Sequence, residues 1–314
     1  MLPKLQQFLF LLKLARTHSF LFVLARVLAR LGLKSKLISV IEFFSTPEFN
    51  RPTKSAEILL KSFDTLSLSP KDFFSQLEGA DCLEIGCGKY AGLAPFFISF
   101  GAKNFVGIDP SVDSKLIKNN LIHSRFFEPS LKAHGKLAQD LRVKYDLGSG
   151  NHENSANAFK QNTFFFSDTV EKFPENRVNF KFCCSISCLE HIIDLETAVS
   201  KLASHTSFNC IHFHIVNFSN HLSKSEPFIQ LYEMPYADFG RKWNYNVNGL
   251  RVPDILSIFQ KSGIPVAYYP LDIRKDLLPS HIHSDWIDKY DTDVLAVRTA
   301  LFVSECLNLE NSSL

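Results

Sequence analysis

Short apolar runs alternate with helical segments from residue 81 to near the end of the chain, and this alternation strongly limits the possible folds. The runs that we expect to form strands are residues 82–85, 105–108, 163–166, 180–185, 208–216, 266–269 and 294–303. Helices are expected between them, at residues 93–100, 195–203 and 253–261. Strands that are separated by helices tend to pair in parallel, with helices covering both faces of the sheet. The sequence therefore predicts an α/β fold with a doubly wound, mostly parallel sheet of seven strands.

The chain before this pattern has a helical character throughout. We expect an N-terminal helical region at residues 1–78, a sheet domain at 79–306 and a tail at 307–314. The polar stretch 112–160 is a long insertion in the sheet domain, and we expect it to contain helices and to be able to cover a substrate. The Phe-rich runs 96–97 and 164–166 are expected in the core.

The net charge of +2 conceals two regions of opposite sign. Residues 1–41 contain seven of the 34 basic side chains and no acidic ones, whereas the rest of the chain has 27 basic and 32 acidic residues. A nucleic-acid-binding domain would be broadly basic. We therefore expect no nucleic-acid partner for the sheet domain.

The basic segment 1–41 has no uncharged apolar stretch long enough to span a membrane, and basic residues recur through it unlike in a secretory signal. Three roles stay open: packing on the sheet domain, peripheral contact with an anionic membrane surface, and targeting. Seven cysteines without a Cys-x-x-Cys pair suggest buried thiols in a reducing compartment. We expect a cytoplasmic protein, with membrane-surface contact as an option, and leave its oligomeric state open.

A glycine-rich turn follows the first expected strand. Gly86 and Gly88 allow the backbone to turn tightly and to approach a ligand. Asp109 ends the next strand, where an acidic side chain can accept the hydroxyls of a ribose. Glu84 stands two residues before the first glycine and would repel a pyrophosphate. This combination favours a nucleoside cofactor that carries an ammonium group and no phosphate.

These residues resemble the motifs of class I S-adenosylmethionine-dependent methyltransferases, which have a Rossmann-like fold. The similarity includes four segments in the family's order: residues 83–88, 106–110, 166–174 and 182–192. It implies S-adenosylmethionine as cofactor, held by Glu84, Gly86, Cys87, Gly88, Asp109, Pro110, Asp168, Thr169 and Ser185. The family's fourth strand commonly opens with Phe-Asp, whereas Phe180-Lys181 stands here.

Methyl transfer to a hydroxyl requires that the hydroxyl lose its proton, so a His or a carboxylate is expected beside the methyl group. Candidates follow the fourth and fifth strands, where ligands of open α/β sheets bind. His191 is our first choice of base and His221 the second, and Glu190 completes the predicted catalytic set. Glu190 and His191 could equally be structural.

The acceptor is predicted only by class. Segments 218–222, 241–243 and 248–251 resemble those of methyltransferases that act on sugars and surface polysaccharides, so we expect a hydroxyl of a small molecule, glycan or glycolipid. An NAD-dependent sugar-modifying oxidoreductase and a non-catalytic cofactor-binding scaffold are the alternatives. His212 and His214 share one face of a strand, but two histidines do not define a metal centre. We therefore predict no metal site.

Overall fold

The computed structural model describes residues 52–66, 70–147, 155–175, 179–243 and 247–304, together with five single positions at 24, 27, 28, 41 and 45. The tail and nearly all of the basic segment 1–41 lie outside these residues, so the expected roles of that segment stay predictions. Among the described residues, no helix has both the length and the apolar character needed to cross a membrane. Six of the seven cysteines are described, and all six are free thiols, five of them buried.

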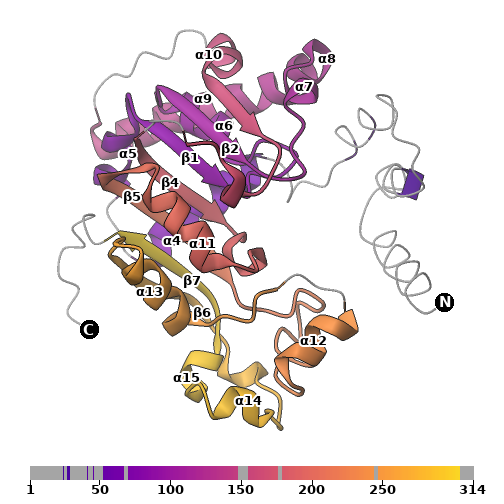
Figure 1. The fold of residues 1–314 in the computed structure, drawn as a ribbon. Helices are drawn as coiled ribbons and strands as arrows, with labels where there is room; N and C mark the ends of the chain where they lie inside the picture. The colour runs from indigo at the N-terminus through magenta and orange to yellow at the C-terminus, as the bar shows by residue number, and fades with distance from the viewer. Residues whose placement is uncertain are drawn as a thin grey trace.

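The predicted sheet is present, with seven strands in the order β3-β2-β1-β4-β5-β7-β6 (Figure 1). The strands are β1 (Asp81–Ile85), β2 (Asn104–Ile108), β3 (Thr163–Phe166), β4 (Phe180–Ile186), β5 (Thr206–Asn217), β6 (Val266–Ile273) and β7 (Val297–Ser304). The first five pair in parallel, and β7 runs antiparallel to both β5 and β6. The fold class is thus confirmed as a doubly wound, mostly parallel sheet of seven strands.

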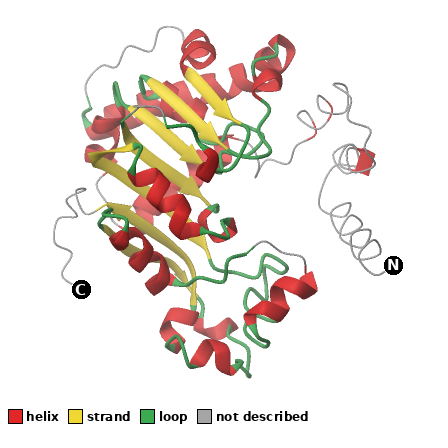
Figure 2. Ribbon diagram, in the orientation of Figure 1, coloured by secondary structure: helices red, strands yellow, loops and turns green. Residues whose placement is uncertain are grey.

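Helices cover both faces of the sheet (Figure 2). One face packs against α4 (Pro52–Leu66), α5 (Pro70–Leu77), α6 (Ala94–Ser99), α9 (Glu128–Tyr145) and α10 (Ser155–Asn162). The other packs against α11 (Leu195–Ala203) and α13 (Val252–Lys261). Alternate residues of one strand serve the two faces, as Cys82 and Leu83 do on β1.

Phenylalanine fills the first of these faces. Phe73 of α5 packs edge-on against Phe182 of β4 at 4.6 Å between ring centroids, and Phe63 of α4 lies 5.4 Å from Phe213 of β5. The helices before residue 79 therefore share one core with the sheet. Phe96 and Phe97 are buried as predicted, but Phe164 is 51% exposed because β3 is an edge strand, so that part of the prediction was wrong.

The described parts of the stretch 112–160 are largely helical, as the sequence predicts. The stretch contains α7 (Ser114–Ile117), α8 (Asn120–Ile122), the π-helical turn His123–Phe127, α9 and α10. Its apolar residues, including Phe127 and Phe159, join the core beside α6. Much of the insertion is therefore a layer of the domain itself.

The carboxyl-terminal half carries a second aromatic cluster away from the sheet. It is formed around α12 (Tyr236–Trp243), α14 (Ser284–Ile287) and α15 (Thr292–Leu295), in the lower part of Figure 1. The strand predicted at 294–303 begins only at Val297, because residues 292–295 form a helical turn instead. The remaining short turns are Val170–Lys172, Leu189–His191 and Lys275–Leu277.

Candidate functional site

A cavity of about 490 Å³ lies at the carboxyl ends of β1, β2, β3 and β4. This is the edge where open α/β sheets bind their ligands. The predicted site residues in its wall are Gly86, Asp109, Pro110, Asp168, Thr169 and His191. Six predicted residues that follow different strands are therefore brought to one cavity.

The turn after β1 depends on glycine for two separate reasons. Gly86 has φ +75° and Gly88 has φ +63°, both in the left-handed region. A β-carbon at Gly86 would also overlap with the side chain of Cys188, whereas one at Gly88 would meet nothing within 4 Å. Close approach to the loop after β4 thus requires a glycine at position 86.

Asp109 connects the end of β2 to this turn. Its Oδ2 accepts the backbone N–H of Gly88 at 2.9 Å, and its Oδ1 accepts the N–H and the hydroxyl of Ser111 at 2.7 and 2.5 Å. A carboxylate offers about four acceptor positions, so these three bonds leave one position free. A second becomes free if the exposed Ser111 hydroxyl is displaced by a ligand hydroxyl. Asp109 thus keeps acceptor capacity at the cavity, and its role toward a ribose stays a prediction.

Glu84 lies beneath the turn and outside the cavity wall. The carboxylate is 2% exposed and accepts the N–H of Leu93 at 2.7 Å, and a β-carbon at Gly92 would overlap with it. The pKa of Glu84 is raised to about 8, mainly by burial and in smaller part by the charge of Asp109, against the lowering effect of the Leu93 hydrogen bond. Cys87 and Gly88 are likewise not among the residues of the wall.

The cavity wall is acidic. It contains Asp109, Asp168, Glu171 and Asp194, and of its described residues none is Lys or Arg. Lys172 pairs with Asp168 at 3.0 Å from outside the wall. The N–H of Thr169 and then Lys172 lower the pKa of Asp168, whereas Glu171 Oε2 is buried without a hydrogen-bond partner. The wall therefore favours a cationic ligand over an anionic one.

The three predicted catalytic residues meet beside this cavity. Glu190 is 2% exposed, and its Oε1 accepts the N–H of Asn217 at 3.3 Å and lies 3.9 Å from His221 Nε2. His191 is exposed, lines the cavity and has its ring 4.9 Å from that of His221. Burial raises the pKa of Glu190 to about 8, and burial followed by the charge of His191 lowers that of His221 to about 4.

Asn248 is a residue of this region whose role the sequence analysis did not predict. Its side-chain amide donates to the carbonyl oxygens of Leu189 and Ile192 at 2.7 and 2.9 Å. Its backbone N–H donates to the backbone carbonyl oxygen of Glu190 at 2.7 Å. It therefore fixes the turn that carries Glu190 and His191. The predicted similarity of residues 248–251 was the only signal in the sequence, and it did not indicate this contact.

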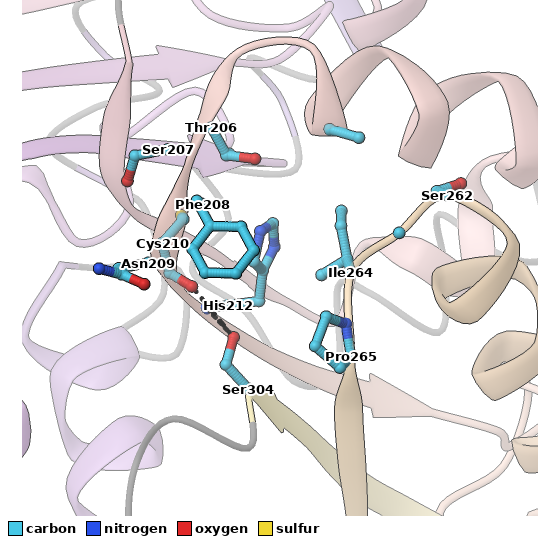
Figure 3. A pocket seen from close by; sticks show the side chains of 12 residues that line it. Thr206, Ser207, Phe208, Asn209, Cys210, His212, Ser262, Ile264, Pro265 and Ser304 are labelled. Carbon is cyan, nitrogen blue, oxygen red and sulfur yellow. Dashed lines mark hydrogen bonds between the residues drawn. The ribbon is translucent and has the colours of Figure 1, made fainter.

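Ser185 does not reach the cavity. Its fully buried hydroxyl lies 2.9 Å from His214 Nδ1, and His214 Nε2 lies 3.4 Å from His212 Nδ1. His212 lines a second cavity of about 330 Å³, which lies near the start of β5, at the end of that strand opposite to the first cavity (Figure 3). Of the predicted site residues, none is among the described residues that line it.

Among the residues that the structure describes, two groups of side chains have the spacing of metal ligands. In each, one ligand atom per residue lies within 4.8 Å of the others. The first group is Cys183 with the His212–His214 pair, and the second is Glu190, His191 and His221.

Comparisons with known proteins give structural likenesses only. No family model matches the sequence, and no curated protein matches it. A structure from Listeria monocytogenes, assigned as an S-adenosylmethionine-dependent methyltransferase, is 10% identical with a TM-score of 0.40, covering 78% of this chain and 96% of that one. An S-adenosylmethionine-dependent methyltransferase from Mesorhizobium loti is 11% identical with a TM-score of 0.41, covering 73% and 91%. Phosphoethanolamine N-methyltransferase 2 from Haemonchus contortus, in complex with S-adenosyl-L-methionine, is 14% identical with a TM-score of 0.39, covering 72% and 48%. Similarity at this level determines neither the cofactor nor the acceptor of this chain.

Proposed function

We propose that this protein is an S-adenosylmethionine-dependent methyltransferase that methylates a hydroxyl of a small molecule, glycan or glycolipid. The acidic wall of the 490 Å³ cavity carries the proposal. S-adenosylmethionine has a sulfonium, an ammonium and a ribose but no phosphate, so an acidic wall attracts it. The same wall repels the pyrophosphate of NAD, which counts against the oxidoreductase alternative.

The residues present fit such a cofactor. Asp109 would accept the ribose hydroxyls, and the turn at Gly86 allows the ligand to approach the backbone. Asp168 and Thr169 follow β3 in the cavity wall and would lie beside the adenine of the cofactor. The cavity volume falls within the range of about 300–1,000 Å³ that is usual for small-molecule sites.

When bound, S-adenosylmethionine supplies a methyl carbon activated by the sulfonium, and transfer breaks the carbon–sulfur bond with its electron pair remaining on sulfur. The protein must align the acceptor oxygen with that carbon and exclude water. It must also favour loss of the acceptor proton. His191 lines the cavity and would face the acceptor, with Glu190 and His221 grouped beside it.

Titration calorimetry with S-adenosylmethionine and with NAD tests the proposal. We expect saturable binding of the first and none of the second. If NAD binds and S-adenosylmethionine does not, the proposal is overturned. Transfer of a labelled methyl group to molecules of a cell extract would then identify the acceptor class and show whether oxygen is the methylated atom.

A further inference from the structure

Glu190 contains an unexplained buried oxygen. The carboxylate lies in the turn after β4 and is 2% exposed. Oε1 has the N–H of Asn217 as a donor, at a long 3.3 Å, but Oε2 is buried without any hydrogen-bond partner. A buried carboxyl oxygen without a partner is costly, and proteins compensate by keeping the group protonated, by pairing it with a cation or by coordinating a metal. Oε2 is therefore an open position for a proton or a cation.

The groups nearest to that oxygen are metal ligands. His221 Nε2 lies 3.9 Å from Glu190 Oε1, and His191 completes a set whose three ligand atoms all lie within 4.8 Å of one another. Ligand atoms about 2.1 Å from one cation lie about 3 Å apart when they subtend a right angle. Binding one ion would therefore require the three side chains to move closer together and His221 Nε2 to leave its contact with the carbonyl oxygen of Asn217.

The Cys183 group differs in this respect. There His214 Nε2 lies 3.4 Å from His212 Nδ1 and His214 Nδ1 lies 2.9 Å from the Ser185 hydroxyl, so both ring nitrogens of His214 already have partners. In the Glu190 group His221 Nε2 lies 3.4 Å from the carbonyl oxygen of Asn217, but Glu190 Oε2 has no hydrogen-bond partner. The two groups have similar spacing, but only the second contains a buried carboxyl oxygen without a partner.

We propose that Glu190, His191 and His221 bind a divalent cation of the manganese-to-zinc series at the border of the cofactor cavity. Two imidazoles and one carboxylate are a donor set that such ions accept, and the set leaves coordination positions open. His191 belongs to both the ligand set and the cavity wall, so the open positions would lie toward the acceptor.

This inference rests on the proposed function and narrows its substrate class. A cation held there would bind the acceptor through oxygen, align it with the methyl carbon and lower the pKa of its hydroxyl, whose proton then passes to water. The favoured acceptors carry a hydroxyl with a second oxygen nearby, such as a vicinal diol or a hydroxy acid, because two oxygens can chelate one ion.

Manganese binding tests the inference without any acceptor. The full-length protein is stripped with a chelator, dialysed and titrated with Mn²⁺, and free Mn²⁺ is followed by electron paramagnetic resonance. We expect one saturable site per chain that Zn²⁺ displaces. Glu190→Gln keeps the shape of the side chain and should weaken binding more than about tenfold, as should His191→Gln, whose exposed ring can be changed without disturbing the core.

His283→Gln is the matched control, because His283 forms a part-exposed pair with Asp285 at 3.2 Å. It should leave Mn²⁺ affinity unchanged. Absence of saturable Mn²⁺ and Zn²⁺ binding, or equal affinity of the wild type and both ligand variants, would overturn the cation site. Calorimetry with S-adenosylmethionine on the same metal-free samples separates the two proposals, since cofactor binding does not require the ion.

Discussion

Asp109 Oδ2 accepts the backbone N–H of Gly88 at 2.9 Å, across 21 residues of sequence. The bond connects the carboxyl end of β2 to the turn after β1, and both segments border the proposed cofactor cavity. A carboxylate at the second strand end thus does two things here. It fixes the glycine turn, and it keeps acceptor capacity for a ligand.

Asp109→Ala should weaken S-adenosylmethionine binding more than about tenfold. Hydrogen bonds to a charged group contribute about 1.5–3 kcal/mol, and 1.4 kcal/mol corresponds to a factor of ten. Calorimetry measures the effect. Asp113→Ala is the control, because exposed Asp113 only caps α7 by accepting the N–H of Leu116 at 2.9 Å. Equal affinities of Asp109→Ala and the wild type would remove Asp109 from the site.

Gly86→Ala should destabilise the protein more than Gly88→Ala. Both positions have positive φ, so both alanines carry a backbone cost of about 1–2 kcal/mol. At position 86 the new methyl group also overlaps with Cys188, and overpacking adds about 1–3 kcal/mol. Urea unfolding of the two variants checks the order. Gly79→Ala has φ +69° and open space around it, and should match Gly88→Ala; a larger loss there would contradict the steric account.

Local patterns predicted the strands and the glycine turn well, because each depends on a few adjacent residues. Strand β3 and helix α11 have the bounds that the sequence predicted, at 163–166 and 195–203. The prediction for 294–303 was wrong at its start, since one helical turn at 292–295 depends on packing in the carboxyl-terminal aromatic cluster.

The candidate-site residues that directly follow a strand could be predicted from their motif. Contacts between segments that are far apart in the sequence could not. Glu190 and His191 follow from the fourth strand, but Asn248 contacts their turn from 56 to 59 residues away. Ser185 lies near the end of the same strand, yet its hydroxyl contacts His214 on β5 and does not reach the cavity. No local pattern contains such contacts between separate segments.

Glu84→Gln should flatten the pH dependence of stability. Burial raises the pKa of Glu84 from an ordinary 4.5 to about 8, so between these pH values the folded state binds more protons than the unfolded state. Stability from this group therefore falls as pH rises from 4.5 to about 8. Glutamine stays neutral and can still accept the N–H of Leu93.

Urea unfolding at about pH 5, 6.5 and 8, which cover the window between the two pKa values, measures this effect. The unfolding free energy of Glu84→Gln should rise relative to the wild type as the pH increases. Glu175→Gln, whose side chain is 88% exposed, should follow the wild type. Parallel profiles for Glu84→Gln and the wild type would show that Glu84 is charged in the folded protein at neutral pH.

Asn248→Ala should loosen the turn that carries Glu190 and His191. The substitution removes two donors, which now bond to the carbonyl oxygens of Leu189 and Ile192, and leaves those oxygens without them. We expect a loss of about 1–3 kcal/mol in unfolding free energy. Amide hydrogen exchange should become faster in residues 189–193, and Mn²⁺ affinity should fall with it.

Asn248→Asp separates hydrogen bonding from size. Aspartate has nearly the same shape, but its carboxylate donates nothing and would face two carbonyl oxygens, so it should destabilise the turn at least as much as alanine. Asn104→Ala, which loses one side-chain bond to Asp81 at the start of β2, should leave exchange in residues 189–193 unchanged. Rescue of slow exchange by Asn248→Asp would show that filling the space matters more than the donated bonds, and Asn248 would then not be the positioning residue of this turn.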